Sequence, residues 1–194
     1  MDNLFFSLAE EIRKCTACPL WKSRTLAVPG EGIFNKQISD KQIKLFFIGE
    51  APGEEENRQG LPFIGRSGKF LDEMLKIAGV ERKDVFITGA VKCHPPKNRN
   101  PTAKELKICK ELWLDNQINI IQPKLIVILG KVALKSLLDG EISNKEKINE
   151  SHGTIITKNK QKYFITYHPA AGMRFPKIKK SMIEDFKKLK KFVN

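Results

Sequence analysis

The sequence lacks any stretch of apolar residues long enough to cross a membrane, because no run approaches the roughly 20 residues that a spanning helix needs. Its first residues, Met1-Asp2-Asn3, are not the start of the basic-then-apolar pattern of a secretion signal. It also has no internal repeat and no low-complexity linker. We therefore expect a cytoplasmic protein without a membrane partner, folded as one domain over residues 1–194.

Negative charge is scarce relative to positive charge. The chain has 35 Lys and Arg residues against 22 Asp and Glu residues, a formal net charge of +13. Such an excess favours a polyanionic partner such as nucleic acid, although a basic surface that is merely solvated is the alternative. A phosphate-binding P-loop is excluded, since the glycine-rich segment 49–65 does not end in the required Gly-Lys-Ser/Thr.

Cysteine is also rare, but its arrangement is informative. Four cysteines occur, at Cys15, Cys18, Cys93 and Cys109. Disulfides are uncommon in the cytosol, so a quartet with one Cys-x-x-Cys pair favours a metal site that ties the N-terminal arm to the rest of the chain. Thiolates select zinc or iron–sulfur clusters. Zinc ribbons usually have two such pairs, so a single pair favours a [4Fe–4S] cluster, with zinc or four unrelated buried thiols as alternatives.

The apolar pattern predicts alternating helices and strands. Helices are predicted over residues 4–14, 67–78, 102–120, 131–138 and 177–192, and strands over 43–48, 85–88, 125–129, 154–157 and 163–167. Ser67 is the predicted cap of the second helix, and Thr102 with Glu105 forms a capping box at the third. The alternation indicates an α/β sandwich around a mainly parallel sheet.

Ligands of such sheets bind beyond the carboxyl ends of the strands, which points to residues 49–53, 89–93 and 167–171. In the first region Glu50 directly follows a strand, whereas Glu54–Glu56 is interpreted as a solvated acidic turn. Phe63 could present an aromatic face to a flat ligand or could be an ordinary core residue. His168 follows the last strand and precedes a proline, a position suited to a catalytic imidazole.

Five motifs occur in an order that carries a resemblance. They are Cys15-x-x-Cys18, Gly49-Glu50-Ala51-Pro52-Gly53, Pro62-Phe63-Ile64-Gly65, Val91-Lys92-Cys93-His94-Pro95-Pro96 with Cys109, and His168-Pro169-Ala170. Each motif alone is weak. Together they closely resemble the family 4 uracil-DNA glycosylases, the iron–sulfur type of archaea and bacteria, over nearly the whole chain.

The resemblance implies a fold, a reaction and a set of roles. The fold would be a three-layer sandwich with a central, mainly parallel four-stranded sheet. The enzyme would hydrolyse the N-glycosidic bond of deoxyuridine in DNA, releasing free uracil and leaving an abasic site for base-excision repair. In this family the loop at Gly49, Glu50 and Ala51 lines the uracil pocket, Phe63 matches the phenylalanine that stacks on the flipped base, and His168 matches the histidine that donates to the uracil O2.

The resemblance also implies how water is positioned. The better-known glycosylase family has an aspartate to position water where this chain has Ala51, so Glu50 is the nearest carboxylate candidate and Glu56 a weaker one. The cluster would be structural, held by the four cysteines. A monomer on the nucleoid, with replication or repair factors as further partners, is expected.

One position departs from the family pattern. Gly89 stands where the family often has an asparagine that reads the edge of uracil. A glycine there widens the pocket, which predicts weaker discrimination against cytosine or entry of other deaminated bases. We expect Gly89→Asn to sharpen the preference for uracil.

Basic residues near these motifs are the predicted DNA contacts. Arg174 and Lys177 follow the His168 loop, and Lys97 and Arg99 follow the third cysteine. In relatives the histidine loop enters the minor groove, so Met173 or Arg174 would fill the gap left by the flipped nucleotide. A basic iron–sulfur protein that recognises damaged or single-stranded DNA without cleaving the glycosidic bond is the alternative to an enzyme.

Overall fold

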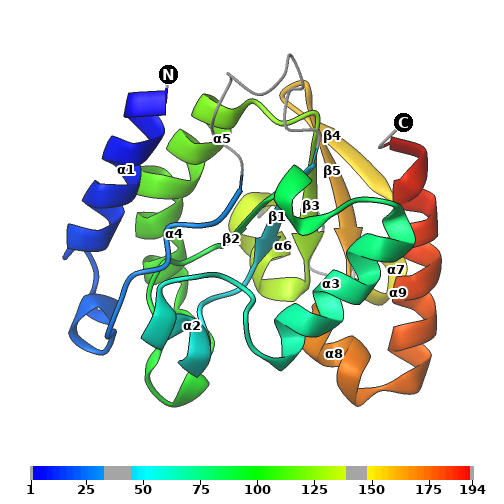
Figure 1. The fold of residues 1–194 in the computed structure, drawn as a ribbon, viewed down its shortest axis with the longest axis horizontal. Coiled ribbons are helices and arrows are strands. Elements are labelled where there is room, and N and C mark those ends of the chain that lie inside the picture. Colours follow the sequence, from blue (N-terminus) through cyan, green and yellow to red (C-terminus); the bar gives the residue numbers. More distant parts are fainter. Residues whose placement is uncertain (1, 33–44, 139–147, 193–194) are drawn as a thin grey trace.

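The computed structural model describes residues 2–32, 45–138 and 148–192. A five-stranded sheet lies at its centre (Figure 1). The strands are β1 (Leu45–Gly49), β2 (Phe86–Gly89), β3 (Leu125–Leu129), β4 (Ile155–Lys158) and β5 (Gln161–Thr166). Their order across the sheet is β2-β1-β3-β5-β4. The pairs β2–β1, β1–β3 and β3–β5 are parallel, and β4 pairs antiparallel with β5.

The mainly parallel sheet expected from the sequence is confirmed, with one strand more than the four that the resemblance implied. The apolar pattern predicts all five, including 154–157, where β4 joins β5 through a hairpin whose turn residues Asn159 and Lys160 have φ of 49° and 66°. Positive φ at both central residues matches the twist of a hairpin. The predicted start of the first strand, residues 43–44, lies outside the described residues.

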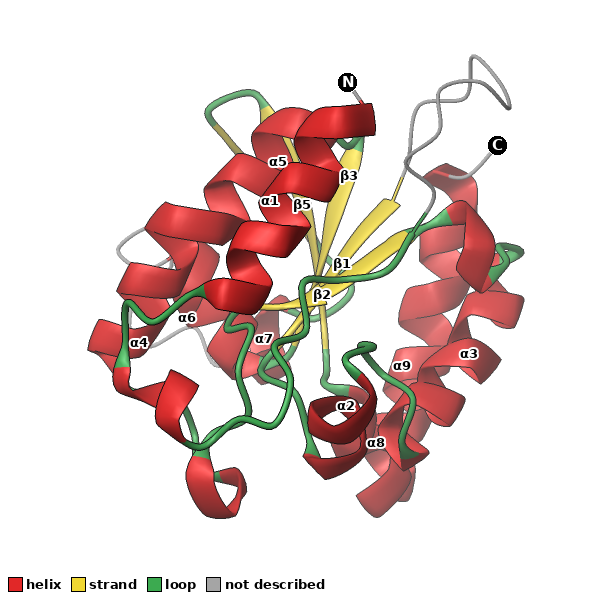
Figure 2. Ribbon diagram, turned by 60° about the vertical axis from the view of Figure 1, so that its left-hand side comes forward, coloured by secondary structure: helices red, strands yellow, loops and turns green. Residues whose placement is uncertain are grey.

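Helices cover both faces of the sheet, as Figure 2 shows. One face carries α3 (Arg66–Ala78), α8 (Pro169–Arg174) and α9 (Pro176–Leu189), which pack against one another. The other carries α1 (Asp2–Lys14), α4 (Ala103–Cys109), α5 (Asp115–Ile121) and α6 (Lys131–Leu138). Two short helices are α2 (Glu54–Gln59), between β1 and α3 in the chain, and α7 (Ile148–Ser151), before β4. The three-layer architecture follows from burying both faces of a parallel sheet.

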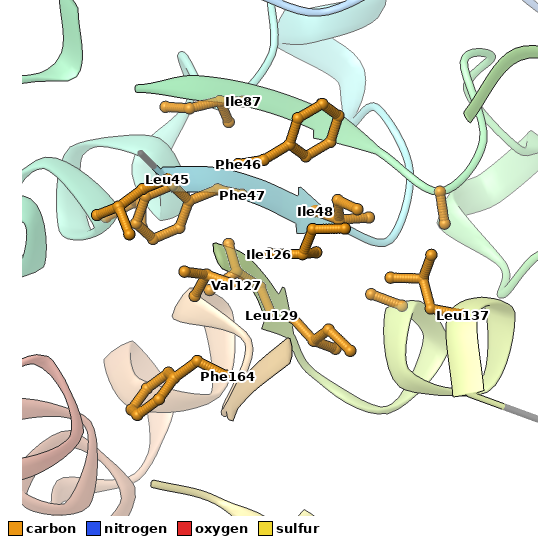
Figure 3. Packing of buried hydrophobic residues seen from close by; sticks show 14 of the residues in the cluster. Leu45, Phe46, Phe47, Ile48, Ile87, Ile126, Val127, Leu129, Leu137 and Phe164 are labelled. Carbon is orange, nitrogen blue, oxygen red and sulfur yellow. The ribbon is translucent and has the colours of Figure 1, made fainter. Parts of the chain in front are cut away.

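The core lies on both sides of the central strands (Figure 3). Every residue of β1 and β3 is buried, so these strands are continuous apolar runs rather than alternating ones. Neighbouring aromatic residues of β1 face opposite layers: the ring of Phe46 lies 4.7 Å from that of Phe86, and the ring of Phe47 lies 6.2 Å from that of Phe186 in α9. Phe47 thereby joins the sheet to the α9 layer, whereas Phe46 packs against the neighbouring strand β2.

The helix boundaries show one confirmed cap and one wrong one. Thr102 and Glu105 form the expected capping box, with Glu105 N–H donating to Thr102 Oγ1 at 3.2 Å. The predicted cap Ser67 is wrong, because α3 begins earlier, with Gly65 at the cap position. Neither α2 nor α8 was expected from the sequence. A π-helical turn (Lys110–Leu114) joins α4 to α5, within the third predicted helix.

The segment before residue 33 runs along the outer side of β2. Glu31 and Ile87 exchange backbone hydrogen bonds at 2.8 and 2.9 Å, and Val28 N–H donates to the Lys92 carbonyl at 2.8 Å. This strap of residues 25–32 brings Val28 to the end of β2. Among the described helices, none has the length and apolar character needed to span a bilayer.

Candidate active site

A cavity of about 150 Å³ lies beyond the carboxyl ends of β1, β2 and β5. Such a volume is enough for one six-membered ring. Its lining comes from the strap, the segments after β1 and α2, α2 itself, the end of β2, the first turn of α3 and the cap of α8. The lining residues are Val28, Ala51, Pro52, Gly53, Glu56, Pro62, Phe63, Ser67, Gly89 and His168. A larger polar hollow of about 940 Å³ lies away from these loops, near the start of β5.

Phe63 is held in an unusual conformation on one side of the cavity. Its φ is 49°, in the left-handed region, which costs on the order of 1–3 kcal/mol for a bulky residue and recurs at functional sites. Its ring covers Gly49, because a Cβ on that glycine would lie 2.4 Å from Phe63 Cζ. Its carbonyl passes close to α3, where a Cβ on Gly68 would lie 1.7 Å from the oxygen. The two glycines thus leave room for the ring and the carbonyl of Phe63.

His168 also lines the cavity, at the N-terminal cap of α8. Its Nδ1 accepts a hydrogen bond from Ala170 N–H at 3.2 Å. Burial lowers the pKa of His168 to about 4, and the nearby charge of Glu56 opposes that change only in part. The ring is therefore neutral near pH 7, and with Nδ1 accepting, its proton is on Nε2. His168 is a ready-made hydrogen-bond donor.

The structure brings Phe63 and His168 together, with ring centroids 5.8 Å apart. Ala51 and Gly89 also line the cavity, as the sequence predicts for them. Gly49 lies beneath the Phe63 ring rather than in the lining. The arrangement places an aromatic face and an N–H donor on the same small cavity, where both can contact one flat ring.

Glu50 is half-buried and is not among the cavity-lining residues. Burial raises the pKa of its carboxyl group. Its backbone carbonyl accepts a hydrogen bond from Val91 N–H at 3.2 Å, which joins the loop after β1 to the loop after β2. Through this hydrogen bond Glu50 joins the two loops.

Glu56 is a buried carboxylate that holds the loops of the cavity. Its Oε1 accepts from the N–H groups of Ile64 and Gly65, both at 2.9 Å, and its Oε2 accepts from Gly53 N–H at 3.1 Å. The interpretation of Glu54–Glu56 as a solvated turn is wrong for Glu56, which belongs to α2 and is buried. The spacing Gly53-x-x-Glu56 was the available signal, since a capping-box glutamate lies three residues after its cap.

Gly89 ends β2 beside Gly49. A Cβ on Gly89 would lie 2.7 Å from the Val91 carbonyl oxygen, so a side chain there requires residues 89–91 to shift. The Gly89 carbonyl accepts from the buried ammonium of Lys92 at 2.8 Å, and that ammonium also donates to Thr88 Oγ1 at 2.7 Å. Burial lowers the pKa of Lys92 to about 8.

The predicted DNA contacts fall on exposed positions after the pocket loops. Met173, Arg174 and Lys177 are exposed on α8 and at the start of α9, close after His168. Lys97 is exposed in the turn after the third cysteine. Arg99 differs, because it forms a bidentate ion pair with Glu105 at 2.7 and 2.9 Å, which lowers the pKa of that carboxyl group to about 2.

The four cysteines converge from three parts of the chain. Cys93 and Cys109 are buried, and Cys15 and Cys18 are half-buried. Cys93 lies near enough to Cys15 and Cys18, and Cys109 to Cys93 and Cys18, for their charges to act on one another. Burial raises the pKa of Cys109 to about 12, so its thiolate needs a positive partner. Within the described residues no three His, Cys, Asp or Glu side chains are close enough to hold one metal ion.

Two side chains already direct N–H groups at these sulfurs. Arg24 Nη1 donates to Cys93 Sγ at 3.2 Å, and Trp113 Nε1 donates to Cys15 Sγ at 3.3 Å. Arg24 also donates from Nη2 to the Arg13 carbonyl at 2.7 Å, which fixes the end of α1. Hydrogen bonds to the sulfurs are characteristic of iron–sulfur ligation, so this donor set fits a thiolate-bound cluster.

Comparison with known proteins agrees with the geometry. The family model of the uracil DNA glycosylase superfamily matches residues 36–190. A type-4 uracil-DNA glycosylase of Sulfurisphaera tokodaii is 44% identical, covering 98% of this chain and 84% of the relative. One of Thermotoga maritima is 40% identical, covering 99% and 96%. A type-5 uracil-DNA glycosylase of Thermus thermophilus is 32% identical over 71% of this chain and 73% of the relative. The chain belongs to the uracil DNA glycosylase superfamily, in its type-4 family.

Proposed function

We propose that this protein is a uracil-DNA glycosylase that hydrolyses the bond between uracil and deoxyribose in DNA. The observation that carries the proposal is the single-ring cavity beyond the strand ends that Phe63 and His168 both line, with their rings 5.8 Å apart. A base can enter it only after leaving the duplex stack, which is how glycosylases reach their target. The names of the type-4 relatives support the same reaction. Acting on uracil in chromosomal DNA, the protein would be found at the nucleoid.

His168 would assist the departure of the base. As the bond between C1′ and N1 breaks, its electron pair leaves with uracil and negative charge develops on the uracil O2. The Nε2–H of the neutral imidazole, fixed by the Ala170 contact, would donate to that oxygen. A preorganised donor of this kind is worth about 3–4 kcal/mol of transition-state stabilisation. Water then adds to C1′, and the uracil anion takes up a proton.

Phe63 would stack on the extruded base, and the loop from Gly49 to Ala51 would surround it. Glu50 would orient water or the base. It directly precedes the cavity-lining Ala51, it is half-buried, and burial raises the pKa of its carboxyl group. Glu56 is less suited to orient water, since its two carboxylate oxygens already accept three backbone N–H groups.

DNA would approach the exposed residues that surround the cavity loops. Arg174 and Lys177 would neutralise phosphates beside the extruded nucleotide, and Met173 or Arg174 would fill the gap it leaves. Lys97, which follows Cys93, would contact the phosphate backbone of the DNA. A contact from Arg99 would have to compete with its ion pair to Glu105.

The four cysteines would hold a [4Fe–4S] cluster with a structural role. The single Cys-x-x-Cys pair supports the cluster over zinc, since zinc ribbons usually have two such pairs. When bound, the cluster would supply the positive charge that keeps the thiols ionised, and would join the N-terminal arm to α4. A brown protein with a broad visible absorption band supports this assignment, and a colourless protein with bound zinc contradicts it.

The decisive experiment uses an oligonucleotide with one deoxyuridine. We expect release of free uracil and strand scission after alkali, and no release by His168→Asn. A protein that binds this DNA but releases no uracil is the non-enzymatic binding protein instead.

A second candidate function is a glycosylase with a broader base range. Gly89 favours it, because this cavity-lining position carries no side-chain amide that would read the edge of uracil. Parallel assays with hypoxanthine and xanthine in the same oligonucleotide measure that range. Activity on uracil alone contradicts it.

A further inference from the structure

Arg82 is a half-buried arginine outside the cavity whose hydrogen bonds are completely used. Its Nε and Nη2 donate to Glu31 Oε2 at 3.1 and 2.7 Å, and its Nη1 donates to Asp72 Oδ1 at 3.1 Å. Nη1 also donates to the Phe63 carbonyl at 3.2 Å, and Nη2 donates to the Pro62 carbonyl. Each of the five N–H groups of the guanidinium therefore has an acceptor.

Two of those acceptors belong to the residue that forms one wall of the cavity and to its predecessor. Phe63 has a left-handed backbone, which a bulky residue adopts only when its surroundings impose it. Its carbonyl lies between the guanidinium of Arg82 and Gly68 of α3, which leaves that peptide little freedom to rotate. Without the guanidinium, residues 62–63 can relax, and a rotation of the backbone moves the ring away from Gly49.

Arg82 is itself fixed from two directions. Glu31 belongs to the strap along β2, and Asp72 belongs to α3, so the guanidinium is held between these two elements, and neither carboxylate is among the cavity-lining residues. Its side chain is 23% exposed, and the ion pairs are correspondingly shielded from solvent. A lysine can keep the charge for Glu31 and Asp72, but its single ammonium cannot span both carboxylates and both carbonyls.

We propose that Arg82 is a positioning residue of the glycosylase reaction, which holds the carbonyls of Pro62 and Phe63 so that the Phe63 ring faces His168. The inference rests on the proposed stacking of Phe63 on the base. Arg82 acts through Phe63 and touches neither the base nor the bond that breaks.

The test is a double-mutant cycle measured as kcat/KM for uracil release and as inhibition by free uracil. Arg82→Lys is expected to lower kcat/KM about tenfold and to weaken uracil inhibition by a similar factor. Phe63→Ala is expected to do the same or more. In the double variant the Arg82 substitution should add less than a twofold further loss, since contacting residues that act through one another are not additive.

Control variants separate positioning from folding. Asp72→Asn removes one ion pair of Arg82 but leaves both carbonyl contacts, so it should lower the melting temperature while keeping uracil inhibition near the parental value. Arg58→Gln changes an exposed arginine that pairs with Glu54 and Glu55. It should leave both kcat/KM and uracil inhibition at the parental values.

The outcomes are distinguishable. Losses that multiply in the double variant, or an Arg82→Lys protein with parental kcat/KM, overturn the positioning role while leaving the stacking of Phe63 intact. A Phe63→Ala protein with parental activity overturns the stacking role as well. If Arg82→Lys does not fold, uracil inhibition of Arg82→Gln, measured on the fraction that remains folded at low temperature, gives the same decision.

Discussion

Glu56 gives the sharpest test of how the cavity is held together. Replacement of Glu56 by glutamine keeps the shape of the side chain but puts an NH₂ group where one carboxylate oxygen was. If the amide oxygen faces Ile64 and Gly65, the NH₂ group opposes Gly53 N–H, so one acceptor becomes a donor and the other two hydrogen bonds lose their charge. A hydrogen bond to a charged group is worth about 1.5–3 kcal/mol, so Glu56→Gln should lower the free energy of unfolding by about 2–3 kcal/mol.

The matched control is Glu55→Gln, one residue earlier in α2. Glu55 is exposed and pairs with Arg58 at the surface, an interaction worth at most about 1 kcal/mol. Urea unfolding measures both variants, with an unchanged dependence on urea as the sign that two-state behaviour is kept. Activity of Glu56→Gln should fall by about tenfold or less, because no reacting group is removed. Equal stability of the two variants, with a large loss of kcat in Glu56→Gln alone, would refute the scaffold role and favour a water-orienting one.

Three further predictions concern the reaction and the DNA. His168→Asn should lower kcat/KM by about 100- to 1,000-fold and leave the stability little changed. The parent protein should keep its activity as the pH falls to about 4, the pKa of His168, where protonation removes the neutral imidazole. The same lowered pKa means that the contribution of His168 to stability is present above its unfolded pKa of about 6.5 and is lost as the pH falls toward 4; uracil release and urea unfolding against pH check both points. Arg174→Ala should weaken binding to duplex DNA more than to single-stranded DNA in a titration, and equal losses contradict a wedge. Gly89→Asn should lower the ratio of hypoxanthine release to uracil release. It should also lower the stability, because the new Cβ would lie 2.7 Å from the Val91 carbonyl oxygen. Unchanged ratios of uracil, hypoxanthine and xanthine release contradict a role of Gly89 in base selection.

The sequence predicted the sheet and the site loops because both depend on local patterns. The run 125–129 is apolar without interruption, which is what a strand buried on both faces requires, and it became β3. The strand-end rule pointed to the loop that carries His168, because the carboxyl ends of parallel strands meet at one edge, whereas the place of Phe63 at the pocket was implied by the family resemblance. Their chemical roles remain proposals that the variants above address.

What the sequence could not predict depends on contacts between distant segments. The six residues of α2 are mostly charged and have no apolar period, so only the loops that surround Glu56 explain why it is buried. Arg82 was missed because two of its acceptors are backbone carbonyls, which carry no sequence signal. Arg99 looked like a free cation beside a cysteine, and its pairing with Glu105 depends on where α4 begins.

The two edge strands of the sheet, β2 and β4, affect how prone the protein is to aggregate. Strap residue Glu31 occupies hydrogen-bonding groups of β2 that a foreign strand would otherwise use. At the opposite margin β4 is only four residues long, and Lys158 at its end precedes a second lysine in the turn. Short, lysine-bearing or covered margins discourage cross-β stacking between molecules. A partly melted population should therefore recover its native state on cooling instead of growing into fibrils.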